Sequence, residues 1–215
     1  MPSGSVGLDV FYPIVPDVAW LARLVPLGVK TVQLRLKDAA PDRVRREISE
    51  SMEICARHGC QLIVNDYWRD ALALGADYIH LGQEDLAAAD VEAIHAKGVR
   101  LGISTHSEEE LAVALAAKPT YVALGPIYET RLKVMKWAPQ GLARVTAWKK
   151  RIGSLPLVAI GGITPERADG VRAAGADSLA VITDFFTHAD PVARVRQWLT
   201  WAEQSRPELP RGGGL

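Results

Sequence analysis

Cysteine is scarce in this sequence, which contains only Cys55 and Cys60. Their separation is not the C-x-x-C spacing of a zinc site. Cys55 falls in a predicted helix, and Cys60 lies just before a predicted strand. We therefore expect both to be small buried apolar residues, and neither metal ligands nor disulfide partners.

The sequence also lacks an excess of charge and a long apolar run. Its 25 Lys and Arg residues balance 25 Asp and Glu residues, which favours neither nucleic acid nor an anionic membrane surface as a partner. No apolar run approaches the roughly 20 residues of a membrane span, and the first residues do not resemble a signal peptide. We expect a cytoplasmic protein whose partners are small molecules.

Three common catalytic motifs are missing as well. There is no G-x-G-x-x-G dinucleotide fingerprint and no G-x-x-x-x-G-K-[ST] phosphate loop, so neither a Rossmann cofactor nor a P-loop is supported. No G-x-S-x-G elbow surrounds Ser104, so this serine is expected to hydrogen-bond a substrate and not to act as a nucleophile.

What the sequence does contain is a regular alternation of short apolar runs with longer segments of helical period. Strands are predicted at residues 10–15, 31–35, 61–65, 78–81, 100–104, 121–125, 157–160 and 178–182. Helices are predicted at residues 18–27, 42–58, 70–75, 90–96, 108–117, 141–151, 165–174 and 192–202.

Eight such units in 215 residues predict an α/β fold, a single-domain (β/α)8 TIM barrel, with an open doubly wound sheet as the alternative. We expect an N-terminal arm at residues 1–9, a catalytic barrel at residues 10–203 and a disordered tail at residues 204–215. In a barrel the active site lies at the carboxyl ends of the strands, so the residues that follow each strand are the candidates.

Acidic residues follow the third and fourth predicted strands. Asn65 and Asp66 end the first of these strands, and Asp85 follows the second. Paired carboxylates on neighbouring strand ends suit Mg²⁺, which commonly serves a phosphate. The structural alternatives are helix capping by Asp66 and a surface turn at Asp85. A zinc site formed by His80, His106 and an acidic residue is a further alternative.

Cationic and amide groups follow the second strand. Period two sends Gln33, Arg35 and Lys37 to one face and the leucines between them to the other. We expect these three side chains to point into the barrel mouth, where the amide suits a heterocycle and the cations suit an anion. A surface ion-pair face is the alternative.

A long connection at residues 126–141 is expected to form a flap over the site. It carries Thr130, Arg131, Lys133 and Lys136, and cations on such a loop can close over a phosphate. We expect Arg131 and Lys136 to be solvated charges and Lys133 to face the site.

The last two strands end in segments that are typical of phosphate sites. Gly161 and Gly162 follow the seventh strand, and Ile182 and Thr183 end the eighth. Barrel enzymes often hold a phosphate here with backbone N–H groups and a helix N-terminus. Asp184 would repel a phosphate, so we expect it to face away and to cap the final helix.

Taken in order, these segments resemble the thiamine-phosphate synthase family. The resemblance covers residues 12–202 and rests on Q-L-R-L-K, V-N-D-Y-W, H-L-G-Q-E-D, G-I-S-T-H, G-P-I-Y-E-T-R-L-K, A-P-Q-G-L, V-A-I-G-G-I and A-V-I-T-D. It implies a (β/α)8 homodimer with Mg²⁺ that condenses 4-amino-5-hydroxymethyl-2-methylpyrimidine diphosphate with a thiazole phosphate. The products are thiamine phosphate and pyrophosphate.

The resemblance also implies roles for individual residues. For the pyrimidine diphosphate it implies Gln33, Arg35, Lys37, Asn65, Ser104 and Lys133. For the thiazole phosphate it implies Thr130, Gly161, Gly162, Ile182 and Thr183. It assigns Mg²⁺ to Asp66 and Asp85, and it implies that Arg35, Lys37 and Lys133 neutralise the departing pyrophosphate.

Two alternatives remain. Glu129 and Thr130 also resemble the flap of thiazole tautomerase, a sister family, but Pro126 stands where that enzyme has a histidine. Synthases commonly have P-T-x-T-K in the flap, and here Leu132 replaces one hydroxyl residue. The alternative from another class is a non-catalytic barrel that binds thiamine phosphate.

Overall fold

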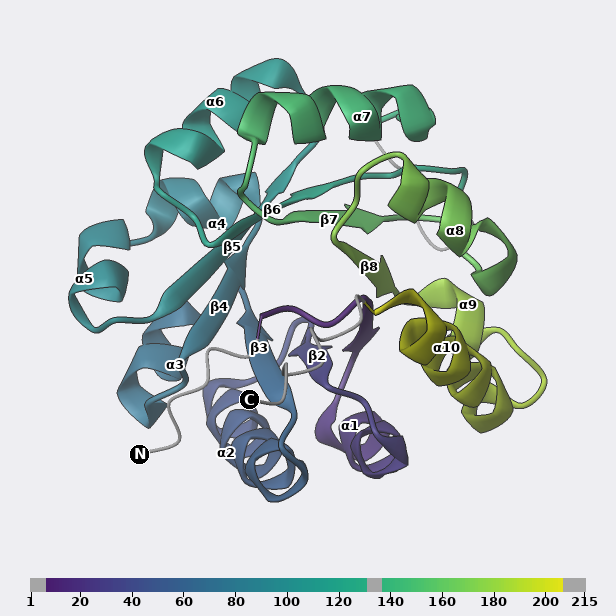
Figure 1. Cartoon of the computed structure of the whole chain (residues 1–215). Coiled ribbons are helices and arrows are strands. Elements are labelled where there is room, and N and C mark those ends of the chain that lie inside the picture. Colours follow the sequence, from purple (N-terminus) through teal and green to yellow (C-terminus); the bar gives the residue numbers. More distant parts are fainter. Residues whose placement is uncertain (1–6, 131–136, 207–215) are drawn as a thin grey trace, which may run out of the picture.

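The structure is a computed structural model that describes residues 7–130 and 137–206, within which eight parallel strands close into a barrel in sequence order (Figure 1). The strands are β1 (Phe11–Val15), β2 (Thr31–Leu34), β3 (Gln61–Asn65), β4 (Tyr78–Leu81), β5 (Arg100–Thr105), β6 (Tyr121–Leu124), β7 (Leu157–Ile160) and β8 (Ser178–Val181). The predicted TIM barrel is confirmed, and the open sheet is wrong because β8 pairs with β1.

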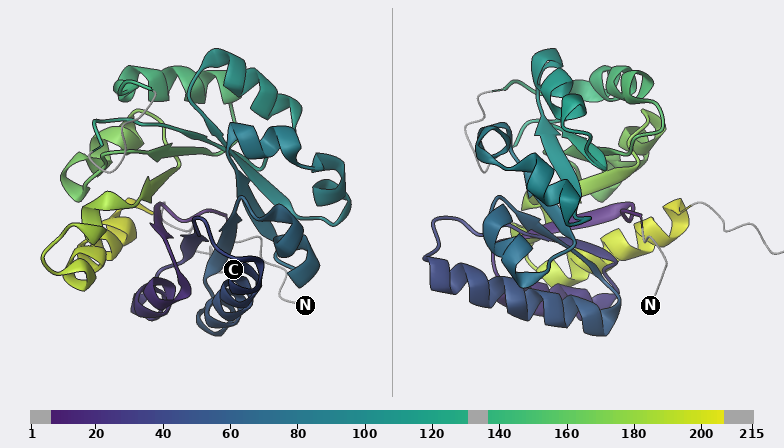
Figure 2. Two further views of the ribbon diagram at one scale, coloured as in Figure 1. Left: turned by 180° about the vertical axis from the view of Figure 1, so that it is seen from behind. Right: turned by 90° about the vertical axis from the view of Figure 1, so that its left-hand side faces the viewer.

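The helices surround the strands in every view (Figure 2). They are α1 (Val18–Leu24), α2 (Pro41–His58), α3 (Trp68–Leu74), α4 (Gln83–Ala88), α5 (Val91–Ala96), α6 (Glu108–Ala116), α7 (Gly141–Ile152), α8 (Pro165–Ala173), α9 (Thr183–Phe186) and α10 (Pro191–Ser205), with a 3-10 turn η1 (Val25–Leu27). Every strand is therefore covered by helices on one face and closed against the barrel interior on the other.

The described residues form two hydrophobic cores. The larger one fills the space between strands and helices, where Phe11 stacks on Trp198 with ring centroids 5.2 Å apart. The smaller one fills the barrel interior and includes three aromatic rings, those of Tyr12, Tyr78 and Tyr121. Cys55 and Cys60 are free and buried, as predicted.

The ends of the described chain meet. Arg206 donates hydrogen bonds of 2.9 and 2.8 Å to the Asp9 carboxylate, so the start of β1 is tied to the end of α10. Residues 207–215 of the predicted tail and residues 1–6 of the predicted arm lie outside the described residues.

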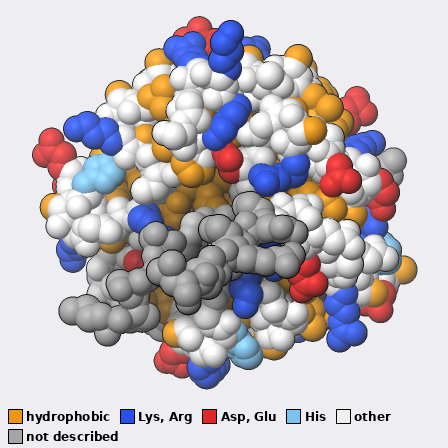
Figure 3. Space-filling view, viewed as in Figure 1, with side chains coloured by type: hydrophobic (Ala, Val, Ile, Leu, Met, Phe, Trp, Pro, Cys, Tyr) orange, Lys and Arg blue, Asp and Glu red, His pale blue; other side chains and the backbone are white. Residues whose placement is uncertain are grey.

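Surface charge agrees with the balanced composition. Figure 3 shows Lys, Arg, Asp and Glu side chains spread over one face without a large area of one sign. In the part of the chain that the structure describes, no helix has the length and apolar character needed to cross a membrane.

Candidate active site

The carboxyl end of β3 turns sharply at Asp66. Its φ of 65° is in the left-handed region, which Asp adopts more readily than most residues. Its backbone N–H donates to the carbonyl of His80 at 2.9 Å, which ties the turn to the end of β4. Tyr67 is the residue that precedes α3, and no side chain caps that helix, so the capping alternative for Asp66 is wrong.

Asp85 lies in the first turn of α4, which directly follows β4, and not in a surface turn. It faces Asp66. Burial, followed by the negative charge of Asp85, raises the pKa of Asp66 to about 6, against the lowering effects of the Arg35 charge and a hydrogen bond from Asn65. Two carboxylates that oppose each other's ionisation form a pair of oxygen ligands that a divalent cation would stabilise.

The zinc alternative is not supported. Over residues 7–130 and 137–206, no three His, Cys, Asp or Glu side chains are grouped closely enough to hold a metal. His80 lies inside the barrel, whereas the Nδ1 atom of His106 pairs with the Glu110 carboxylate at 2.8 Å. The two histidines therefore have separate partners.

The structure describes Gln33, Arg35 and Lys37 at the end of β2, and the inward direction predicted for Lys37 stays a prediction. Gln33 is buried inside the barrel and donates through Nε2 to the hydroxyl of Tyr12 at 2.6 Å. Arg35 is half-buried, and its charge acts on both Asp66 and His80. Lys37 is exposed beyond the end of β2. Arg35 is therefore close enough to the acidic pair for its charge to act on Asp66, whereas Gln33 lies deeper in the barrel against Tyr12.

Ser104 lies on β5, and its Oγ is 2.8 Å from Nε2 of His80. The other ring nitrogen of His80, Nδ1, is 2.6 Å from the hydroxyl of Tyr121. Burial, with a smaller contribution from Arg35, lowers the pKa of His80 to about 3. The sequence reasoning did not single out Tyr121 or Tyr12, although their alternate positions along β6 and β1 place them inside the barrel.

After β7, Gly161 and Gly162 have φ values of 104° and 64°. A Cβ atom on Gly161 would lie 2.7 Å from Cα of Pro126, and one on Gly162 would lie 2.5 Å from the carbonyl oxygen of Glu129. Glycine is therefore required here because the loop after β6 packs directly on this backbone. From the sequence we expect these glycines for a different reason, the approach of an anion to the backbone.

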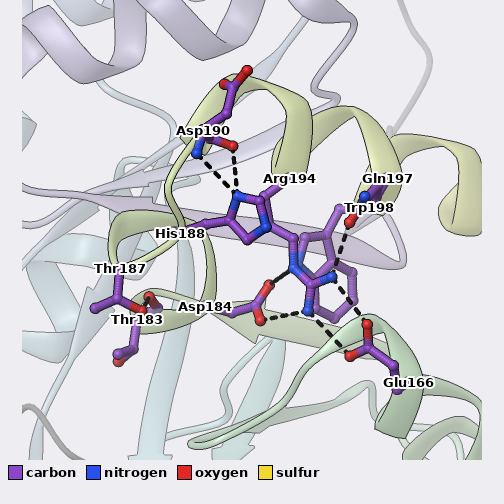
Figure 4. Close-up of polar contacts among 9 residues, drawn as sticks. All are labelled: Glu166, Thr183, Asp184, Thr187, His188, Asp190, Arg194, Gln197 and Trp198. Atoms are coloured by element: carbon purple, nitrogen blue, oxygen red, sulfur yellow. Dashed lines mark hydrogen bonds and ion pairs between the residues drawn. The ribbon is translucent and has the colours of Figure 1, made fainter.

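After β8, Thr183 begins the short helix α9, and Asp184 follows it. Asp184 faces away from the barrel mouth, as predicted, and accepts two hydrogen bonds of 2.8 Å from Arg194 and one of 2.8 Å from Trp198 (Figure 4). It does not cap α10, because Asp190 does so by accepting from the N–H of Ala193.

The same arginine reaches α8. Arg194 donates to both carboxylate oxygens of Glu166, at 3.0 and 3.1 Å, and these hydrogen bonds lower the pKa of Glu166 to about 2 (Figure 4). Glu166 lies in the first turn of α8, and Asp184 in the first turn of α9. Arg194 thereby fixes the starts of the two helices that follow β7 and β8.

Part of the predicted flap is described. Thr130 is half-buried, whereas Arg131, Lys133 and Lys136 lie outside the described residues. On the far side of that gap the ring of Trp137 stacks on His106 with centroids 5.7 Å apart. Gln140 donates to the carbonyl of His106 at 2.9 Å, so this end of the loop is tied to the loop after β5.

Comparison with known proteins identifies the family. The family model described as thiamine monophosphate synthase matches residues 11–185. A thiamine-phosphate synthase of Rhizobium etli is 59% identical over 192 residues, which cover 89% of this chain and 94% of the relative. The chain belongs to the thiamine monophosphate synthase family.

A second relative agrees with membership of the thiamine monophosphate synthase family, and a solved structure shares the fold. A thiamine-phosphate synthase of Salmonella dublin is 46% identical over 188 residues, covering 87% of this chain and 89% of the relative. A solved structure of thiamine phosphate pyrophosphorylase from Pyrococcus furiosus has a TM-score of 0.79 at 24% identity, covering 92% and 96% of the two chains. That likeness shows the same fold.

In this member of the thiamine monophosphate synthase family, the candidate residues fall into two groups. The first lies at the carboxyl ends of β2 to β5 and comprises Gln33, Arg35, Asn65, Asp66, Asp85 and Ser104. The second lies after β6, β7 and β8 and comprises Thr130, Gly161, Gly162, Ile182 and Thr183. Because all these strands are parallel, both groups lie at one end of the barrel.

Proposed function

We propose that this chain is a thiamine-phosphate synthase that joins 4-amino-5-hydroxymethyl-2-methylpyrimidine diphosphate to a thiazole phosphate. The observation that carries the proposal is the pairing of Asp66 with Asp85 beside Arg35, in a chain 59% identical to a thiamine-phosphate synthase. A diphosphate leaving group needs cations at the strand ends, and this end of the barrel supplies them.

The reaction is a substitution at the benzylic-type carbon of the pyrimidine. The C–O bond breaks and both electrons leave with pyrophosphate, while the amino group of the ring stabilises the cation that remains. The lone pair of the thiazole nitrogen then forms the new C–N bond. No protein nucleophile or base is required, so catalysis rests on charge neutralisation and on alignment of the two substrates.

The first group of residues, together with Lys37 and Lys133, serves the pyrimidine diphosphate. Arg35 and Lys37, together with Lys133, neutralise the charge that develops on the leaving oxygen, and Gln33, Asn65 and Ser104 hold the pyrimidine. Asp66 and Asp85 fit Mg²⁺, because their carboxylates face each other at neighbouring strand ends and the negative charge of Asp85 adds to burial in raising the pKa of Asp66. When bound there, Mg²⁺ supplies further charge neutralisation to pyrophosphate.

The second group serves the thiazole phosphate. Loops after the seventh and eighth strands, together with the N-terminus of a short extra helix, are a frequent phosphate site in barrels, and α9 is such a helix. Gly161, Gly162, Ile182 and Thr183 offer backbone N–H groups there, and Thr130 adds a hydroxyl. Asp184 is kept away from the anion by Arg194.

We also propose that the protein works as a homodimer in the cytoplasm. The family resemblance supports the homodimer, and the two free, buried cysteines fit a reducing compartment.

The test is an assay of the purified chain with the pyrimidine diphosphate, the thiazole phosphate and Mg²⁺, following formation of thiamine phosphate. Omission of either substrate or of Mg²⁺ should abolish the product. Thiazole isomerisation without coupling would favour the tautomerase, and binding of thiamine phosphate without any turnover would favour the non-catalytic barrel.

A further inference from the structure

Five polar side chains form one continuous hydrogen-bonded chain through the barrel interior, here called the interior chain. Gln33 Nε2 is 2.6 Å from Tyr12 Oη, and Tyr12 Oη is 3.0 Å from Tyr121 Oη. Tyr121 Oη is 2.6 Å from His80 Nδ1, and His80 Nε2 is 2.8 Å from Ser104 Oγ. The chain therefore links two residues proposed to bind the pyrimidine, Gln33 and Ser104.

The interior chain crosses the barrel and does not follow neighbouring strands. Tyr12 on β1 meets Tyr121 on β6, and these two strands are not adjacent in the sheet. The crossing is possible because residue 102 is glycine: a Cβ atom there would overlap the ring of Tyr121. The absence of a side chain at Gly102 on β5 therefore makes room for the Tyr121 ring.

The hydrogen bonds of the interior chain all run in one direction, with each group donating to the next from Gln33 toward His80. The Gln33 NH₂ group donates to Tyr12, so the single hydroxyl hydrogen of Tyr12 is left for Tyr121. The hydroxyl hydrogen of Tyr121 then goes to Nδ1 of His80. With Nε2 of Gln33 toward Tyr12, the reverse arrangement would leave the buried hydroxyl hydrogen of Tyr12 without a partner among these groups, at a free-energy cost. Only an amide turned to place Oε1 against Tyr12 would allow it.

This direction determines the state of His80. An Nδ1 atom that accepts a hydrogen bond belongs to the neutral tautomer protonated at Nε2. His80 is buried and its ring nitrogens have only the Tyr121 and Ser104 hydroxyls as hydrogen-bond partners, which favours a neutral ring. Nε2–H then donates to Ser104 Oγ, so the hydroxyl hydrogen of Ser104 is free to be donated elsewhere. Ser104 ends the interior chain and is half-buried, whereas the other four members of the interior chain are buried.

We propose that Tyr12, Tyr121 and His80 are positioning residues that make Ser104 a hydrogen-bond donor and Gln33 Oε1 an acceptor toward the pyrimidine. This inference rests on the proposed function. An aminopyrimidine offers acceptor ring nitrogens and a donor amino group, which complement that pair. The corresponding 4-oxo pyrimidine offers an N–H donor and an oxygen acceptor at the same edge, which do not. The interior chain thus selects the amino substrate over its oxo analogue.

The test is long-range ¹H–¹⁵N correlation NMR of the full chain labelled with ¹⁵N-histidine, which reports the tautomer of His80 directly. The wild type should show His80 protonated at Nε2 at pH 7.5. Tyr121→Phe removes only the hydroxyl, so His80 should lose this single tautomer. Tyr78→Phe is the matched control, because Tyr78 is an interior tyrosine whose hydroxyl accepts from Thr120 and lies outside the interior chain.

Kinetics supply the second readout. Tyr121→Phe should lower kcat/KM for the pyrimidine diphosphate about tenfold, the scale of one lost buried hydrogen bond, and leave KM for the thiazole phosphate unchanged. The ratio of the dissociation constants of the 4-oxo analogue and the amino substrate measures the preference. This ratio should fall in Tyr121→Phe and stay at the wild-type value in Tyr78→Phe.

The proposal is overturned if wild-type His80 is protonated at Nδ1 or at both nitrogens, or if Tyr121→Phe keeps the wild-type tautomer and selectivity. The tautomer is read without turnover, so a chain with no synthase activity but with the expected tautomer and amino preference would contradict the proposed function alone. If Tyr121→Phe does not fold, Tyr12→Phe interrupts the interior chain one step earlier and gives the same readout.

Discussion

Arg194 on α10 and Asp184 on α9 face each other with two parallel hydrogen bonds of 2.8 Å, in the bidentate geometry that planar guanidinium and carboxylate groups favour. Their side chains are 13% and 9% exposed, so solvent screens this pair weakly. Glu166 of α8 shares the same arginine. The pair therefore fixes where α9 begins, next to the proposed site for the thiazole phosphate.

Replacing this arginine should cost stability and thiazole affinity together. Arg194→Met leaves the buried Asp184 carboxylate without its countercharge, although the Trp198 N–H still donates to it, and the free energy of unfolding should fall by about 3 kcal/mol. KM for the thiazole phosphate should rise, while KM for the pyrimidine diphosphate stays unchanged. Urea unfolding and steady-state kinetics measure the two effects.

Arg45→Met is the control for that variant. Arg45 forms an exposed ion pair with Asp70 at the same 2.8 Å, and its loss should change the free energy of unfolding by less than about 1 kcal/mol. Equal losses of unfolding free energy in the two variants would show that the buried ion pair of Arg194 stabilises the fold no more than an exposed one.

The acidic pair should be required for metal-dependent turnover. Asp66→Asn and Asp85→Asn should each reduce activity by more than the roughly 10–100-fold that loss of an outer metal-site partner costs. Neither should unfold the protein, because each removes a repulsion that raises the pKa of Asp66. Glu84→Gln, at an exposed neighbouring position, is the control and should keep full activity. Unfolding of both aspartate variants, or full activity in both, would rule out the metal pair.

Buried His80 should make the fold sensitive to acid. Its pKa of about 3 lies below the value of about 6.5 expected in the unfolded chain. The unfolded chain therefore binds a proton that the folded protein excludes, so stability is full above about pH 6.5 and falls as the pH drops toward 3. Asp66, whose pKa is raised, acts in the opposite direction between its ordinary value and about 6.

Urea unfolding of the wild type and of His80→Asn at pH 7.5 and pH 5 separates these contributions. The loss of stability between the two values should be smaller in His80→Asn by about 1 kcal/mol or more. His188→Gln, at an exposed position, should behave as the wild type does. Equal losses in all three proteins would mean that His80 is accessible to protons in the folded state.

Two glycine substitutions should have opposite effects on stability. Gly102→Ala forces a methyl group against the ring of Tyr121 and should cost about 1–3 kcal/mol through overpacking. Gly170→Ala, in the exposed part of α8 with its nearest neighbour atom at 3.8 Å, should stabilise the helix by about 0.5–1 kcal/mol. Thermal unfolding measures both, and a neutral Gly102→Ala would show that the ring moves freely.

The fold could be predicted because the strand pattern is local. Strands at residues 61–65, 78–81 and 157–160 agree with the observed bounds, since short apolar runs between turn residues define them. Helices α4 and α9 were missed because each begins two residues after a strand ends, where the polar residues were interpreted as site loops. Both begin at strand ends, where they position Asp85 and Thr183.

A site residue could be predicted only where its position along its own strand determines where its side chain lies. Gln33 could be placed inside the barrel by alternation, and Asp66 at a strand end by its position. The interior chain could not be predicted, because Tyr12 and Tyr121 are 109 residues apart and meet only when the barrel closes. The need for glycine at position 102 could not be predicted either, because it comes from contact with the Tyr121 ring on another strand.

The most direct measurement is the stoichiometry of one reaction with purified protein, the two substrates and Mg²⁺. Pyrophosphate and thiamine phosphate should appear in equal amounts and only when all components are present. Pyrophosphate release without thiamine phosphate, thiazole isomerisation alone, or no turnover at all would contradict the assignment of this barrel as a thiamine-phosphate synthase.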